Sequence, residues 1–148
     1  MHNVPIRFHD LFPLIQEEIA KGNSFSFTAF GSSMSPFIVG GKDRVTLSPI
    51  QMPLKKNDVV FFRRKNGEFV LHRIVRILQD HSLILSGDHQ ISTECILPDQ
   101  VIAVLTALER GGKMRKIDSV QTSAWCFFLP IRKFFLHIYL YFRRKFKL

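Results

Sequence analysis

The residues of this chain that are best suited to do chemistry together are a serine and a histidine. Ser33 lies in the run Gly-Ser-Ser-Met-Ser-Pro at residues 31–36, and His72 lies in the apolar run Phe-Val-Leu-His-Arg-Ile at residues 69–74. A serine hydroxyl is almost never ionised at neutral pH, so it needs a neighbouring base to become a nucleophile. Histidine titrates close to neutrality and can serve as that base. The two segments therefore predict a nucleophile and a general base, if the fold brings them together.

The order of several short motifs resembles a known superfamily of serine peptidases. Residues 31–36 resemble the Gly-x-Ser-Met-x-Pro box shared by type I signal peptidases and the LexA-type self-cleaving repressors. Residues 70–75, Val-Leu-His-Arg-Ile-Val, resemble the segment that carries the general base, which is His followed by Arg in the endoplasmic-reticulum and archaeal branch. Residues 87–90, Gly-Asp-His-Gln, resemble that branch's Gly-Asp-Asn-Asn box. Residues 42–45 and 57–61 are similar to its two Gly-Asp-x-Val turns.

The resemblance covers residues 25–112 and implies both a fold and an activity. The fold would be mainly β, a coiled and partly open β-barrel of the signal peptidase/LexA type, and we expect a short helix before it and a basic, aromatic helix after it. The activity would be that of a serine endopeptidase that cleaves a leader or precursor peptide without a metal or an organic cofactor. The partners would be a peptide or preprotein substrate.

The same resemblance assigns a role to each candidate site residue. Ser33 would attack the carbonyl, His72 would take its proton, and Asp88 would hold the imidazole and stabilise its cation. Ser32 and Met34 would contribute to the oxyanion or substrate site, and the Ser33 N–H would donate to the oxyanion. Many signal peptidases carry a serine two positions before the nucleophile, where this chain has Gly31.

Each of these residues also has a structural interpretation. Ser33 and Asp88 are residue types that turns favour, and His72 could be a half-buried strand residue. On that view the chain is an inactive module that binds a peptide or a partner on the same fold, an alternative that Gly31 favours. A LexA-type regulator is the third alternative, although the stretch before residue 24 is too short for two packed DNA-binding helices.

Periodicity and turn signals predict the elements that position these residues. Leu11, Leu14, Ile15 and Ile19 share one face of a helix predicted over residues 9–21, with Asp10 as its N-cap and Gly22-Asn23 as its stop. Frequent turn residues between β-rich runs predict an all-β body. The predicted strands are residues 24–30, 44–48, 58–63, 68–78, 82–86, 101–108 and 113–118, with an Asn-Gly hairpin turn at 66–67.

Charge and composition divide the 148-residue chain into a lead-in at 1–23, a peptidase-like domain at 24–118 and a tail at 119–148. The net charge is +9, and the tail contributes +6 of it without any Asp or Glu. Cys95 and Cys126 form no disulfide framework or metal motif. Charged residues interrupt the first 23 positions, so no signal peptide is predicted. The expected location is the cytoplasm or the periphery of a membrane.

The tail from residue 124 onwards combines dense aromatic residues with basic ones. Such a composition is typical of a segment in the interface of an anionic membrane, which we expect as a partner in place of nucleic acid. A helix packed on the β body and a transmembrane span remain as alternatives. Pro130 is expected to kink or start a helix, and Arg132 and Lys133 interrupt the apolar run.

Overall fold

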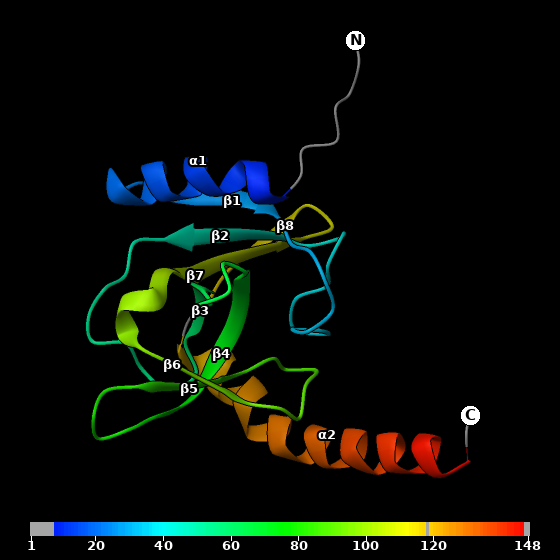
Figure 1. Cartoon of the computed structure of the whole chain (residues 1–148). Helices are drawn as coiled ribbons and strands as arrows, with labels where there is room; N and C mark the ends of the chain where they lie inside the picture. The colour runs from blue at the N-terminus through cyan, green and yellow to red at the C-terminus, as the bar shows by residue number, and fades with distance from the viewer. Residues whose placement is uncertain (1–7, 118, 147–148) are drawn as a thin grey trace.

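The computed structural model describes residues 8–117 and 119–146 of the chain. In this part, eight antiparallel strands form one sheet, and a short helix precedes them while a long one follows (Figure 1). The elements are α1 (Phe8–Ala20), β1 (Phe25–Thr28), β2 (Arg44–Ser48), β3 (Val59–Arg63), β4 (Phe69–Ile77), β5 (Leu83–Ser86), β6 (Glu94–Ile96), a 3-10 turn (Pro98–Gln100), β7 (Val101–Arg110), β8 (Lys113–Lys116) and α2 (Ser119–Phe146). The prediction of a mainly β body with two terminal helices is confirmed.

Strand β7 divides the sheet into two parts. The strand order is β1-β2-β7-β3-β4-β5-β6, and β8 also pairs with β7. One side of β7 pairs with β2, while its other side pairs first with β3 and then, from Ala107 on, with β8. The pairing of β7 with β2 and with β3 is interrupted by one register shift each, and such bulges bend and twist a sheet. As a result, β1 and β2 lie in one layer with α1, and β5 and β6 lie in another near α2 (Figure 1).

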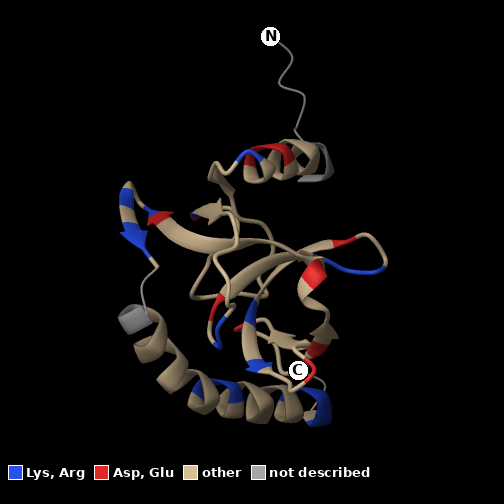
Figure 2. Ribbon diagram, turned by 90° about the vertical axis from the view of Figure 1, so that its left-hand side faces the viewer, with Lys and Arg blue, Asp and Glu red and all other residues tan. Residues whose placement is uncertain are grey.

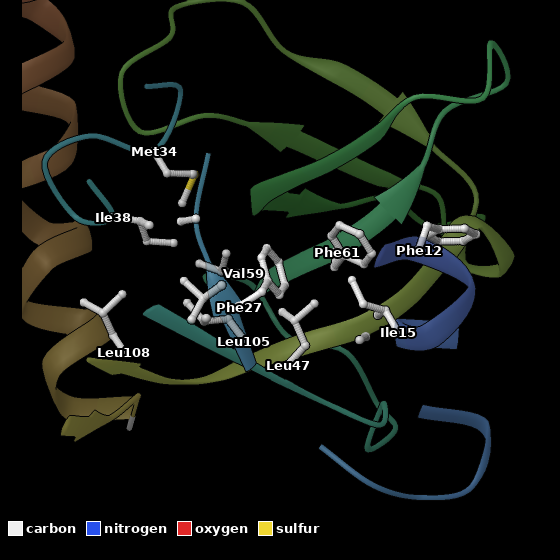
Figure 3. Packing of buried hydrophobic residues seen from close by; sticks show 13 residues of the cluster. Phe12, Ile15, Phe27, Met34, Ile38, Leu47, Val59, Phe61, Leu105 and Leu108 are labelled. Carbon is white, nitrogen blue, oxygen red and sulfur yellow. The ribbon is translucent and has the colours of Figure 1, made fainter. Parts of the chain in front are cut away.

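Two hydrophobic cores lie on opposite faces of β3. Side chains alternate along a strand, so Val59 and Phe61 enter one core, whereas Val60 and Phe62 enter the other. The first core also receives Phe12 from α1, whose ring stacks on Phe69 with 3.4 Å between centroids. Figure 3 shows this core, with α1 side chains at one end and Met34 and Ile38 at the other. The loop that carries Ser33 is thereby fixed to the core by its neighbour Met34.

The ends of α1 and the turn between β3 and β4 can be compared with the capping and turn residues predicted from the sequence. Gly22 has a φ of +84° and follows α1, so the predicted helix stop is confirmed. The predicted N-cap is wrong, because α1 begins at Phe8, before Asp10. Gly67 has a φ of +91° in the predicted hairpin turn between β3 and β4. The left-handed conformation at this position explains why the turn uses glycine.

Two parts of the chain differ from the prediction. The three-residue strand β6 was not predicted at all. The tail forms one helix from Ser119 to Phe146 with Pro130 inside it, so of the two effects expected of this proline, a kink or a helix start, the start is wrong. A search for membrane-spanning helices in the part that the structure describes finds none with the necessary length and apolar character.

Candidate active site

The loop that carries Ser33 is closed at its base by backbone hydrogen bonds. The Ala29 N–H donates to the Asp43 carbonyl, and the Gly41 N–H donates to the Ala29 carbonyl, each over 2.8 Å. Gly31 has a φ of +76°, and a Cβ placed on Gly40 would overlap the backbone of Gly31. The two arms of the loop therefore approach each other as closely as glycine permits.

Ser33 and His72 line the same pocket. This pocket has a volume of about 360 Å³ and lies between the Ser33 loop and the first half of β4. Its other lining residues are mostly apolar and include Phe61, Phe69 and Leu71. The structure thus brings together the two residues that the sequence analysis paired, from elements separated by two strands.

The turn at residues 87–90 fixes the backbone of the candidate nucleophile. The His89 N–H donates to the Ser33 carbonyl over 2.8 Å. A Cβ at Gly87 would lie only 2.5 Å from that carbonyl oxygen, so only glycine allows the turn to come so close. The Gly-Asp-His-Gln segment that resembles the family's box therefore contacts Ser33 directly through its backbone.

His72 is held by a carboxylate that the sequence analysis missed. The imidazole is only 2% exposed, and its Nδ1 lies 2.9 Å from Oε1 of Glu94. Arg64 holds the same carboxylate through Nε at 2.7 Å and Nη2 at 2.8 Å. Because an ionised carboxylate only accepts hydrogen bonds, the Nδ1–H of a neutral His72 donates to Glu94. This tautomer leaves Nε2 free of a proton and able to accept one.

Burial and charge oppose each other at His72. Burial is the largest effect and lowers the pKa of His72, whereas the negative charge of Glu94 raises it in part. The hydrogen bonds from Arg64 lower the pKa of Glu94 itself. At neutral pH the pair is therefore a neutral imidazole beside an ionised carboxylate, which is the protonation state that a general base needs.

The carboxylate of Asp88 binds residues other than His72. This carboxylate is 1% exposed and forms a two-pronged ion pair with Arg73, with distances of 2.8 and 2.7 Å. Trp125 Nε1–H donates to Oδ2 over 2.8 Å. Asp88 was expected to hold the imidazole, but the carboxylate that accepts the hydrogen bond from His72 is that of Glu94. The negative charge of Asp88 still acts on His72 through space and raises its pKa slightly.

The two residues expected beside the nucleophile differ in position. Met34 is buried in the first core and also lines the pocket. Ser32 is exposed, and the pocket lining contains its neighbours Gly31 and Ser33 but not Ser32. The Ser32 carbonyl accepts a hydrogen bond from the Ser35 N–H over 3.0 Å, which tightens the turn around Ser33.

Helix α2 contacts the loops of the site through hydrogen bonds from its basic side chains. Arg132 Nη1 donates to the Ser35 carbonyl over 3.1 Å, and Lys133 Nζ donates to Ser86 Oγ over 2.7 Å. Burial lowers the pKa of Lys133. Together with Trp125, these residues attach the helix to both the Ser33 loop and the turn at 87–90. A helix packed on the β body was one of the alternatives for the tail, but the contacts of these two cations could not be predicted, because in the sequence they only interrupt an apolar run.

One side of β4 is open next to the pocket. Strand β3 pairs with β4 along Phe69–Arg73, but β5 pairs with β4 only from Arg73 onwards. Among residues 8–117 and 119–146, no strand pairs with the second side of residues 69–72. Backbone donors and acceptors on such a side can pair with an extended peptide.

Comparison of the chain with models of known protein families, with curated proteins and with solved structures yields no match. What the site can do therefore rests on its own residues and geometry.

Proposed function

We propose that this protein is a serine endopeptidase that cleaves a leader or precursor peptide, with Ser33 as nucleophile and His72 as general base. The observation that carries the proposal is the shared pocket, which is lined both by Ser33 and by a buried histidine oriented by Glu94. A serine, a histidine and a carboxylate in this relation define acyl-transfer sites on unrelated folds, whatever their order in the sequence.

The proposed reaction uses the two nitrogens of His72 in different ways. Nε2 takes the proton from Ser33 Oγ as the oxygen attacks the peptide carbonyl, and the Ser33 N–H donates to the oxyanion that forms. The imidazolium then gives its proton to the leaving amine, and an acyl-enzyme remains on Ser33. In the second half, Nε2 takes a proton from water as the water oxygen attacks the ester, and then gives this proton to Ser33 Oγ as the bond from Oγ to the acyl carbon breaks. Throughout, Nδ1 keeps its hydrogen bond to Glu94, which stabilises the imidazolium.

The proposed substrate is an extended peptide paired with the open side of β4. Main-chain hydrogen bonds to residues 69–72 would place its scissile bond near Ser33. The pocket is lined largely by apolar side chains, among them Phe61, Phe69 and Leu71, so it suits an apolar side chain next to the cleaved bond. This binding mode and the coiled sheet both agree with the resemblance to the signal peptidase/LexA type of fold, which is part of the proposal.

An inactive peptide-binding module on the same fold is the second candidate. Gly31 favours it, because no side chain is present at that position to act as a second oxyanion donor. A single backbone donor is a weaker oxyanion site, since loss of one donor typically costs a factor of about 10²–10³ in rate.

A fluorophosphonate probe that labels activated serines distinguishes the two candidates. We expect labelling of the full chain, and loss of labelling in Ser33→Ala and His72→Ala. Ser32→Ala is the matched control, because Ser32 is the adjacent serine and lies outside the pocket lining. The wild type and Ser32→Ala should also cleave peptides of a library, whereas Ser33→Ala and His72→Ala should not. Equal labelling of the wild type and Ser33→Ala contradicts the peptidase, whereas peptide binding without labelling supports the module.

A further inference from the structure

The long helix α2 has two sides with different surroundings. Thr122 and Leu129 are buried, and Trp125, Arg132 and Lys133 hydrogen-bond to the site loops. These positions are three or four residues apart, so they share one side of the helix. This side is the one that packs against the β body.

The opposite side of α2 is apolar and exposed. Its residues follow the same helical spacing and are between 50% and 72% exposed. We call this set the aromatic face: Phe127, Phe128, Ile131, Phe134, Phe135, Phe142 and Phe146. An exposed apolar surface that extends over several turns of a helix is unusual on a protein that meets only water. The aromatic face therefore needs an explanation that packing on the body does not provide.

The charges of α2 indicate what covers the aromatic face. The last turn contains Arg143, Arg144 and Lys145, and the chain has no Asp or Glu after residue 118. Figure 2 shows the basic residues at the C-terminal end of the helix. Two copies joined through this face with parallel helices would bring these like charges together, which disfavours that dimer. An anionic surface would instead complement them.

We propose that α2 lies flat on an anionic phospholipid surface, with the aromatic face inserted at the boundary of headgroups and acyl chains. Aromatic residues on one side and cations at the end are the features of an interfacial helix. The flat orientation follows from Arg132 and Lys133, because both are held against the β body in the middle of the helix. The same helix would then bind the membrane with one side and brace the Ser33 loop with the other. Membrane binding by α2 does not require that Ser33 be catalytic.

Sedimentation of the full chain with lipid vesicles tests the proposal. The vesicles contain either phosphatidylcholine alone or phosphatidylcholine mixed with phosphatidylglycerol. Phe134→Ser/Phe135→Ser removes two rings of the aromatic face, and Arg144→Gln/Lys145→Gln removes two cations of α2. Lys113→Gln/Lys116→Gln is the matched control, because it removes two exposed cations from β8. Trp125 is the only tryptophan, and its fluorescence reports whether α2 remains docked on Asp88 in each variant.

We expect binding to the vesicles that contain phosphatidylglycerol and much weaker binding to phosphatidylcholine alone. The α2 charge variant should bind about 30-fold more weakly, since each cation near an anionic surface contributes about 1 kcal/mol. The ring variant should bind at least about tenfold more weakly, while the β8 variant should change by less than either. Equal binding of the ring variant and the wild type, with α2 still docked, would overturn the proposal. So would self-association that the ring variant abolishes, without any binding to vesicles.

Discussion

The site contains two arginine–carboxylate pairs, and they differ in their contact with water. Both side chains of the Asp88–Arg73 pair are almost completely buried, with exposures of 1% and 2%. The Glu94–Arg64 pair is partly open, with exposures of 24% and 34%. In the buried pair, Arg73 has two further contacts. Its Nη1 donates to the Asn57 carbonyl, and its guanidinium lies over the Phe37 ring at 4.5 Å.

This difference in burial corresponds to a difference in role. A charge that is removed from water must keep its partner, so the Asp88–Arg73 pair fixes the turn at 87–90 that contacts Ser33. A partly open pair costs less to build or to break. Its carboxylate Glu94 instead holds His72, whose protonation state the proposed reaction changes. We infer that the buried Asp88–Arg73 pair maintains the geometry of the turn at 87–90, whereas the partly open Glu94–Arg64 pair controls the protonation state of His72.

Asp88→Asn should cause the largest loss of stability. The substitution leaves the buried Arg73 cation without a counterion, and breaking a buried pair typically lowers the free energy of unfolding by about 3–5 kcal/mol. Urea unfolding of the full chain measures this change. Asp99→Asn is the control, because Asp99 is exposed and should change stability by less than about 0.5 kcal/mol. A stable Asp88→Asn variant that has lost probe labelling would instead assign Asp88 to the chemistry.

In contrast to Asp88→Asn, Glu94→Gln should lower activity more than stability. Without the carboxylate, neither the tautomer nor the cation of His72 is favoured, so we expect kcat/KM to fall by a factor of about 10². The free energy of unfolding should change by only about 1 kcal/mol, because the pair is partly exposed.

Glu68→Gln is the matched control for this substitution. Arg64 also binds Glu68, over 2.9 Å, but the Glu68 carboxylate is 59% exposed and does not contact His72. Its loss should leave both activity and stability nearly unchanged. If Glu94→Gln and Glu68→Gln have the same small effect on labelling and cleavage, the open pair has no role in orienting the base.

The two carboxylates also show what the sequence could reveal. Asp88 follows Gly87 in a recognisable motif, and the long strand with His72 has a clear β pattern; both could be predicted. Glu94 lies in β6, which has only three residues and no alternation long enough to detect. Because the missed strand carries the missed carboxylate, the wrong acid was paired with His72. The partner of a buried histidine depends on sheet order, which local patterns do not encode.

Arg73 and α2 illustrate the same limit. Arg73 lies in a predicted strand, but its complete burial in an ion pair with Asp88 follows from the sheet and not from the strand pattern. The tail was predicted to form a basic, aromatic helix, but its docking through Trp125 could not be predicted, because a tryptophan next to a proline-containing apolar run has no specific partner in the sequence.

Trp125→Phe should weaken the buried pair without breaking it. The variant keeps an aromatic ring near Phe37 but removes the N–H that donates to Asp88. A hydrogen bond to a charged group contributes about 1.5–3 kcal/mol, so the unfolding free energy should fall by less than in Asp88→Asn. Equal stability of Trp125→Phe and the wild type, measured by urea unfolding, would show that α2 does not support the Asp88–Arg73 pair.

The pH dependence of activity should show the smallest but most specific effect of the open pair. Burial holds the pKa of His72 below its ordinary value of about 6.5, so kcat/KM should rise with pH along a limb centred below 6.5 and then reach a plateau. Glu94 raises this pKa, so Glu94→Gln should move the limb to still lower pH while the plateau falls. The free energy of unfolding should also depend on pH. Because the pKa of His72 is lower in the folded chain, the unfolded chain binds more protons at this histidine below pH 6.5, and stability decreases as the pH falls. A limb centred above 6.5 in the wild type, or one that Glu94→Gln moves to higher pH, would mean that His72 is not the base whose neutral form the reaction requires.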